Sequence, residues 1–176
     1  MADLTLTPTG PFAGLDLPVS TGACTLSAAT PDVALSIMPF RGQDAAVAAA
    51  LGAALPASGA MVASPAGRLL WAGLDSYTLL GPAPDLPGAA VVDISDSLAG
   101  LLIAGDGARA VLARLCPLDL HPQTFALNAT ARSELAHIAA QISRIEAGFE
   151  ILAARSMAES LLHEITAAMI SVAAQS

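Results

Sequence analysis

The stretch Leu115-Cys-Pro-Leu-Asp-Leu-His-Pro-Gln-Thr-Phe125 concentrates more distinctive chemistry than any other part of this chain. It places a carboxylate, Asp119, and an imidazole, His121, among apolar side chains and two prolines. Proline removes a backbone donor and fixes φ, so a helix that precedes this stretch is expected to end at Pro117. Residues 115–125 are therefore predicted to form a central loop, with regular elements on both sides.

The residues around the central loop predict a second half made of strands and helices. Residues 90–95 and 98–104 favour strands, and Ala108, Val111, Leu112 and Leu115 have the spacing of an amphipathic helix. After the loop, residues 136–145 and 148–153 are predicted as two strands.

A closing helix is expected at the end of the chain. Ser156-Met-Ala-Glu159 has the pattern of a capping box, and the helix it begins should run to about Ala174. Its buried stripe is predicted to include Leu161, Ile165 and Met169.

The first half has a similar order of elements. Residues 33–40 alternate in polarity as a strand does, and residues 44–55 form an amphipathic helix that stops at Pro56. Residues 60–63 and 68–80 are predicted as a strand pair, broken near Gly73, and residues 81–87 as a connector. Each half is thus expected to be strand, helix, strand, strand, with halves at about 33–87 and 88–176. The fold class is α+β, with helices on a mainly antiparallel sheet.

Residues 1–32 are rich in proline and glycine and are predicted as an extended arm with at most short edge strands. Apolar side chains such as Leu15, Leu17 and Leu26 should anchor this arm. The sequence leaves open whether they pack on this chain or on a neighbouring subunit.

The composition limits the classes of function. The chain has 176 residues, an apolar fraction of 55% and a formal net charge of -8, and every basic residue is arginine. Scattered arginine in an acidic chain argues against a nucleic acid partner. No window has the ~18 uninterrupted apolar residues of a spanning helix, so the apolar excess is expected to be buried against partner subunits. The N-terminal sequence lacks the features of a signal peptide, and a cytoplasmic location with reduced thiols is expected.

Four residues are candidates for a functional or organising role. Asp119 and His121 could act as an acid and a base, but a turn-capping carboxylate and a structural histidine account for them better. Arg155 could bind a carboxylate or form a salt bridge within the chain or between subunits. Trp71 is a large strand-face side chain that suits an interface.

The remaining candidates are expected to be structural. Cys116 lies at the unfavourable end of a helix for a thiolate, and two distant cysteines cannot supply a four-ligand zinc site. His137 is expected in an apolar strand and His163 on the closing helix. No dinucleotide fingerprint, P-loop or HExxH pattern occurs, so the chain is predicted to have no catalytic, cofactor-binding or metal-binding residues of its own.

Several motifs in order resemble the gamma subunit of bacterial heterotetrameric sarcosine oxidase. They cover roughly residues 33–174 and are found at Phe40-Arg-Gly42, Leu70-Trp71, Leu79-Leu-Gly-Pro82, Val92-Asp-Ile-Ser-Asp96, Arg114-Leu-Cys-Pro-Leu-Asp-Leu-His-Pro122 with Phe125, Ala129-Thr-Ala-Arg132, Phe149-Glu-Ile-Leu152 and Arg155-Ser-Met157. The Asp93-Ile-Ser95 strand with Ile103-Ala-Gly105 is also similar to the folate-binding fold of aminomethyltransferases, of which the gamma subunit is a shortened relative.

The resemblance implies a structural subunit that packs with alpha, beta and delta subunits, mainly the large alpha subunit. The complex would oxidise sarcosine to glycine, with hydrogen peroxide and formaldehyde or methylene-tetrahydrofolate as products. FAD, FMN, NAD and zinc would be held by the other subunits. A subunit of the related N-methylglutamate dehydrogenase and a free-standing folate-binding protein remain alternatives, as does a scaffold with a different partner.

Overall fold

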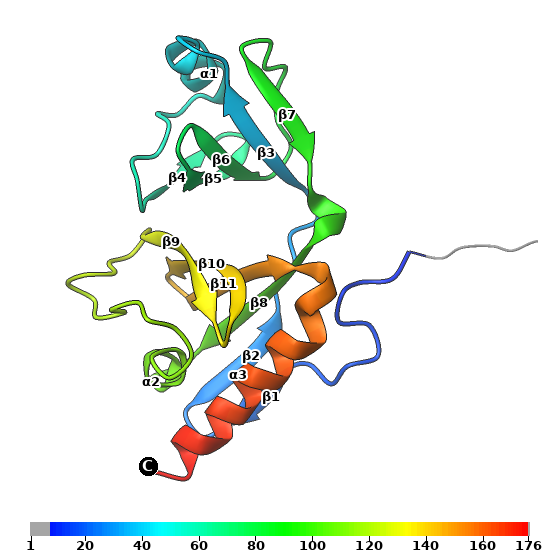
Figure 1. The fold of residues 1–176 in the computed structure, drawn as a ribbon, viewed down its shortest axis with the longest axis vertical. Coiled ribbons are helices and arrows are strands. Elements are labelled where there is room, and N and C mark those ends of the chain that lie inside the picture. Colours follow the sequence, from blue (N-terminus) through cyan, green and yellow to red (C-terminus); the bar gives the residue numbers. More distant parts are fainter. Residues whose placement is uncertain (1–7, 176) are drawn as a thin grey trace, which may run out of the picture.

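The computed structural model describes residues 8–175, which form two antiparallel β-sheets arranged one above the other (Figure 1). Residues 1–7, the start of the predicted arm, and Ser176 lie outside the described residues. The strands are β1 (Val19–Thr21), β2 (Cys24–Ala28), β3 (Ala34–Pro39), β4 (Met61–Ser64), β5 (Gly67–Gly73), β6 (Ser76–Leu80), β7 (Ala89–Asp93), β8 (Leu98–Ala104), β9 (Thr130–Leu135), β10 (Ile138–Ile145) and β11 (Gly148–Ala154). The helices are α1 (Asp44–Leu51), α2 (Ala108–Leu112) and α3 (Ala158–Ala173), with short 3-10 turns η1 (Ser95–Ser97) and η2 (Arg155–Met157).

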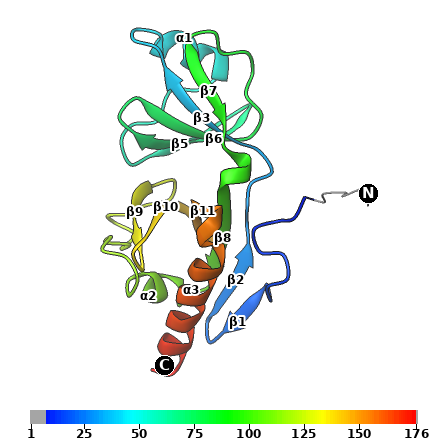
Figure 2. The same ribbon diagram turned by 45° about the vertical axis from the view of Figure 1, so that its right-hand side comes forward.

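Each sheet has its own hydrophobic core, and the molecule therefore has two lobes. The first lobe contains the five-stranded sheet, in the order β4-β5-β6-β3-β7, and α1. The second lobe contains the six-stranded sheet, in the order β1-β2-β8-β11-β10-β9, with α2 and α3 on its core side (Figure 2). The smaller first-lobe core consists of Ile37, Val47, Leu51, Leu69, Leu79, Leu86 and Ala89. The expectation of antiparallel sheets is confirmed, although the fold is mostly β and has two sheets.

The two sheets share one topology. The succession β3-α1-β4-β5-β6 has the same strand neighbours as β8-α2-β9-β10-β11. Each repeat therefore has one strand more than the expected strand, helix, strand, strand. The fifth strand of each sheet lies outside its repeat. β7 follows the first repeat and pairs with β3, and β2 precedes both repeats and pairs with β8. We call this arrangement the strand exchange; it means that the sheets do not coincide with the sequence segments 33–87 and 88–176.

The N-terminal segment belongs to the body of its own chain. β2 is an interior strand between β1 and β8, rather than an edge strand, and its Leu26 is fully buried. Leu15 and Leu17 pack against the second-lobe core. Of the two alternatives for these anchors, the structure shows packing on this chain.

Helix α3 lies where the apolar stripe predicts it. Leu161, Ile165 and Met169 are at most 1% exposed, because a spacing of four residues keeps them on one face. The expected capping box is not formed: η2 precedes the helix, the N-cap is Met157, and no side chain caps it. The 3-10 turn moves Ser156 away from the position from which it could bond the N3 amide.

Three further details differ from the sequence-based expectation. α1 ends at Leu51 instead of Leu55, because Gly52 adopts a left-handed conformation with φ of 66° and closes the last turn. Strand β9 was not predicted; it is an edge strand that carries Arg132 and Glu134. His137 lies in the turn between β9 and β10 with φ of 67°, and not in a strand. Within residues 8–175, no helix is long and apolar enough to cross a membrane.

Candidate functional site

The central loop is organised by the carboxylate of Asp119. Its Oδ1 accepts a hydrogen bond from the backbone N–H of His121 at 2.9 Å, and its Oδ2 accepts one from Thr124 Oγ1 at 2.9 Å. Both bonds favour the ionised form, so they lower the pKa of Asp119, although this side chain is exposed to solvent. The carboxylate thus holds a turn, as Asp commonly does.

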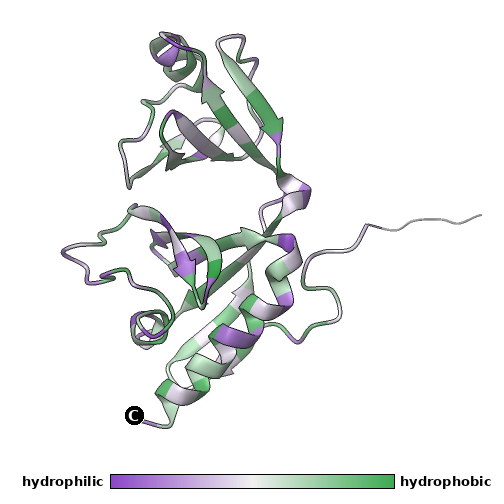
Figure 3. Ribbon diagram, in the orientation of Figure 1, coloured by the Kyte–Doolittle hydropathy of each residue, from purple (hydrophilic) through white to green (hydrophobic). Residues whose placement is uncertain are grey.

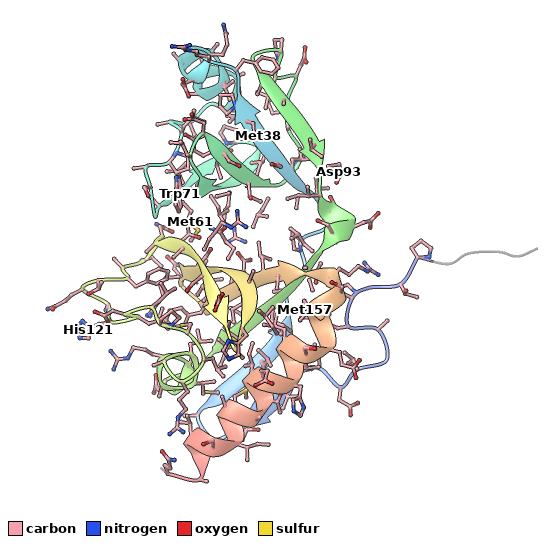
Figure 4. The ribbon with its side chains drawn as sticks, in the orientation of Figure 1. Met38, Met61, Trp71, Asp93, His121 and Met157 are labelled. Atoms are coloured by element: carbon pink, nitrogen blue, oxygen red, sulfur yellow. The ribbon has the colours of Figure 1, made fainter. Side chains whose placement is uncertain are left out.

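His121 also bonds within the loop. Its Nδ1 accepts a hydrogen bond from the backbone N–H of Gln123 at 3.3 Å, and its carbonyl accepts from the N–H groups of Thr124 and Phe125. Phe125 is buried and stacks on Phe149, with 6.5 Å between ring centroids, and so fixes the loop to the core. Figure 4 shows His121 at the outer rim of the molecule, away from Trp71. Asp119 and His121 lie near each other, but their contacts are those of a folded turn.

Arg155 fixes the N-terminal segment. Its Nη2 donates a hydrogen bond to the carbonyl oxygen of Thr9, and Arg155 is only partly exposed. Phe12, three residues farther along, is buried in the second-lobe core. Within the described residues, Arg155 thus bonds a backbone carbonyl; its carboxylate binding or a salt bridge to another subunit stays a prediction.

Trp71 takes part in the contact region between the two lobes, which we call the joint. It does so through its backbone carbonyl. Gln141 Nε2 donates to the Trp71 carbonyl at 2.9 Å and is also 2.7 Å from Thr130 Oγ1. Thr130 and Ser143 share a hydrogen bond of 2.7 Å between their hydroxyls. A bridge between Ala60 and Ala129 brings the edges of the two sheets together beside this network.

An ion pair crosses the same joint. Arg68 Nη2 of β5 lies 2.6 Å from Glu150 Oε1 of β11, and the Glu150 side chain is only 7% exposed. The second oxygen of Glu150 and the Nη1 of Arg68 are buried without a hydrogen-bond partner. An ionised group that is buried without its partner costs free energy. Because Arg68 and Glu150 belong to different lobes, moving the lobes apart would leave Glu150 buried without its cation, and the pair therefore favours this orientation of the lobes.

The polar residues that form this joint leave only a weak signal in the sequence. Gln141 and Ser143 alternate with apolar residues in β10, and Glu150 does so in β11. Such alternation usually marks the solvent side of a sheet. Here Gln141 and Glu150 instead contact the other lobe, through the Trp71 carbonyl and Arg68, and Ser143 bonds Thr130 beside them.

The two cysteines are packing residues in this fold. Both are free and buried, and burial raises the pKa of the Cys24 and Cys116 thiols. A raised pKa disfavours the thiolate that nucleophilic or metal chemistry requires. Among residues 8–175, no group of three or more His, Cys, Asp or Glu is placed to hold a metal ion.

The outer surface of the first lobe is unusually apolar. Met38, Phe40, Val91 and Val92 are among the large hydrophobic side chains that are at least 40% exposed. They lie on or beside β3 and β7, where Figure 3 shows strongly hydrophobic ribbon. A groove of about 390 Å³ between α1 and the residues before β7 continues this surface. An apolar surface of this kind is typical of a protein interface.

The comparisons with individual proteins and with solved structures point to one family. No protein-family model matches the chain. The chain is 33% identical over 155 residues to the sarcosine oxidase subunit gamma of Corynebacterium sp. strain U-96, covering 80% of this chain and 75% of that protein. It is 32% identical over 158 residues to the same subunit of strain P-1, covering 81% and 77%.

A solved structure has the same fold. One chain of the heterotetrameric sarcosine oxidase from Corynebacterium sp. U-96, in complex with pyrrole 2-carboxylate, superposes with a TM-score of 0.77 and 28% identity. The match covers 89% of this chain and 88% of that one. The chain therefore belongs to the family of sarcosine oxidase gamma subunits.

Proposed function

We propose that this chain is a non-catalytic structural subunit of a heterotetrameric sarcosine oxidase that works in the cytoplasm. The observation that carries the proposal is the match along nearly the whole chain to a component of the heterotetrameric enzyme. The complex would oxidise sarcosine to glycine, with hydrogen peroxide and formaldehyde or methylene-tetrahydrofolate as products. The partners would be the alpha, beta and delta subunits, mainly the large alpha subunit.

The candidate residues support a structural role. Asp119 and His121 use their polar groups to fold the central loop, and Arg155 fixes the N-terminal segment. The thiols of both cysteines are buried with raised pKa values. From the family resemblance, we assign FAD, FMN, NAD and zinc to the other subunits, together with the chemistry of oxidation. The shortened aminomethyltransferase-like fold is taken to serve as a scaffold.

Affinity purification from the native cell tests this function. A tag on this chain should capture three further chains, and the eluate should be yellow and consume oxygen when sarcosine is added. A colourless chain without partners would contradict the proposal. Tetrahydrofolate binding by the purified chain alone would favour a free-standing folate-binding protein.

The choice of substrate is tested on the same complex. Turnover should be faster with sarcosine than with N-methylglutamate, with oxygen as the electron acceptor. The opposite preference, together with activity on an artificial acceptor alone, would assign the chain to an N-methylglutamate dehydrogenase.

A further inference from the structure

The two sheets have matching strand orders except at one position. In the second lobe, the order β9-β10-β11-β8-β2 is continued by β1, which pairs antiparallel with β2. In the first lobe, the corresponding order β4-β5-β6-β3-β7 ends at β7. The first sheet thus lacks the strand that corresponds to β1, and within residues 8–175 no strand pairs with the outer side of β7.

The backbone of β7 offers the groups that such a strand would bond. Ile94 N–H donates to the Ala34 carbonyl and Phe40 N–H to the Gly88 carbonyl, each across the β3–β7 ladder. Hydrogen-bonded pairs alternate along an antiparallel ladder, so Ala90 and Val92 direct their N–H and C=O groups toward β3. Val91 and Asp93 direct theirs toward the free edge. An incoming strand would meet two N–H donors and two carbonyl acceptors there.

The first four side chains of β7 are apolar, as in a strand that has a neighbour on both sides, although two of them are exposed in this chain. Val91 is 40% exposed and Val92 is 49% exposed, and they lie on opposite faces of the sheet. Met38, opposite Ala90 in the ladder, adds a further exposed apolar side chain. Figure 1 shows β7 on the outer side of the first lobe, on the side away from β6.

The other sheet edges have features that discourage pairing. β9 carries the charged residues Arg132 and Glu134, and β1 is three residues long and contacts α3. β4 is followed at once by Pro65. Charge, shortness, cover and proline are the usual protections of an edge strand. β7 has none of them in its first four residues, Ala89–Val92, which indicates that its edge is occupied in the assembled protein.

We propose that an extended apolar segment of a partner subunit pairs antiparallel with β7 and forms the sixth strand of the first sheet. The inference rests on the proposed function, which supplies the partner. β-strand addition would provide affinity through main-chain hydrogen bonds, and the exposed valines would select apolar side chains. A second copy of this chain is disfavoured as the occupant because each copy carries a net charge of -8.

Proline substitutions test the backbone bonds. Val91→Pro deletes an N–H that faces the free edge and leaves the β3–β7 hydrogen bonds in place. Ala63→Pro is the matched control, since Ala63 is exposed and, by the register of β4 with β5, also directs its N–H outward. Each tagged variant is expressed in the native cell, and the partner protein captured per tagged chain is measured. Val91→Pro should reduce capture about tenfold or more, while Ala63→Pro should not.

A second pair of variants keeps the test decisive if the prolines disturb folding. Val92→Lys places an edge-protecting charge on β7, and Ala63→Lys places the same charge on β4. Only the β7 variant should lose the partner. In the wild-type complex, the amide hydrogens of Val91 and Asp93 should exchange as slowly as that of Val92, which already faces β3.

The outcomes separate this inference from the proposed function. Normal capture by both β7 variants, or fast exchange at Val91 and Asp93 in an intact complex, would overturn the β7 inference alone. A wild-type chain that captures no partner would contradict the proposed function as well. Loss of a homodimer in Val91→Pro would show that a second copy occupies the edge, and would also overturn the inference.

Discussion

Arg68 and Glu150 face each other across the joint between the two lobes, with 2.6 Å between Nη2 and Oε1. The two residues come from strands β5 and β11, which belong to different sheets. Each lobe has a separate core, so contacts of this kind hold the lobes in their relative position.

Arg68→Ala should destabilise the chain by roughly 3 kcal/mol, because it leaves the Glu150 carboxylate buried without its cation. The value is at the low end for such a pair, since 37% of the Arg68 side chain is exposed. The measurement is the midpoint of urea unfolding with the slope held constant. The double variant Arg68→Met/Glu150→Leu is the control and should recover most of the loss, because no charge remains buried. Equal destabilisation in both variants would assign the effect to lost packing.

Replacing Leu161 and Ile165 together by Ala should reduce the free energy of unfolding by on the order of 4 kcal/mol or more. Both side chains are 0% exposed within the second-lobe core, so truncation removes contacts and leaves a cavity. Ile170→Ala, on the exposed face of the same helix, should change stability little. Unchanged melting temperature in the double variant would show that this face of α3 is not a core.

Asp119→Ala should weaken the central loop in a pH-dependent manner. Hydrogen bonds from the His121 amide and the Thr124 hydroxyl lower the pKa of Asp119 in the folded chain. A lowered carboxyl pKa stabilises the fold above the unfolded-state value of about 3.9, and this stabilisation is lost as pH falls through the folded-state pKa. The difference in free energy of unfolding between wild type and Asp119→Ala should therefore be greatest near neutral pH and should disappear in acid. A difference that is constant with pH would show that the carboxylate charge is not involved.

His121→Ala should leave the turnover of an intact complex within a few-fold of wild type. The imidazole accepts a backbone hydrogen bond inside the loop, and its loss affects the loop rather than a reaction. Oxygen consumption with sarcosine should be measured at a matched subunit content. A collapse of kcat with assembly unchanged would make His121 a catalytic residue.

Arg155→Ala should loosen the N-terminal segment without unfolding the second lobe. The lost bond joins the guanidinium to the Thr9 carbonyl, while buried Phe12 still anchors the segment. Amide hydrogen exchange should rise at Thr9 and Gly10, which lie between two prolines without amide hydrogens, and remain unchanged in β11. Phe12→Ala is the comparison variant and should increase exchange farther along, through residues 12–17. Unaltered exchange in Arg155→Ala would show that Phe12 alone holds the segment.

Much of the fold could be predicted from local pattern. The spacing of Leu161, Ile165 and Met169 defines one helix face whatever surrounds it, and the alternation in residues 33–40 marks β3. Turn residues mark the end of the first helix, although Gly52 ends it earlier than Pro56 would. Asp119 is a turn-capping residue of a common kind, because an Asx side chain bonds the backbone two residues on.

The partners of the strands could not be predicted in the same way. The residues of β2 and β7 do not indicate which sheet each strand joins, because the pairing depends on strands elsewhere in the chain. β9 was missed because its central side chains, Arg132 and Glu134, belong to an edge and are not buried. The Arg68–Glu150 pair was missed because its two residues are 82 positions apart.

The strand exchange has a consequence for synthesis of the chain on the ribosome. β2 is made before any residue of the first sheet and can pair with β1, but the strand on its other side, β8, begins only at Leu98. β3 must likewise await β7 before its second edge is paired. The first sheet can therefore be completed once β7 has emerged, whereas the second sheet must wait for β8. No single cut between residues 33 and 93 yields two fragments that each fold independently, so the gene cannot be divided there into two autonomous modules.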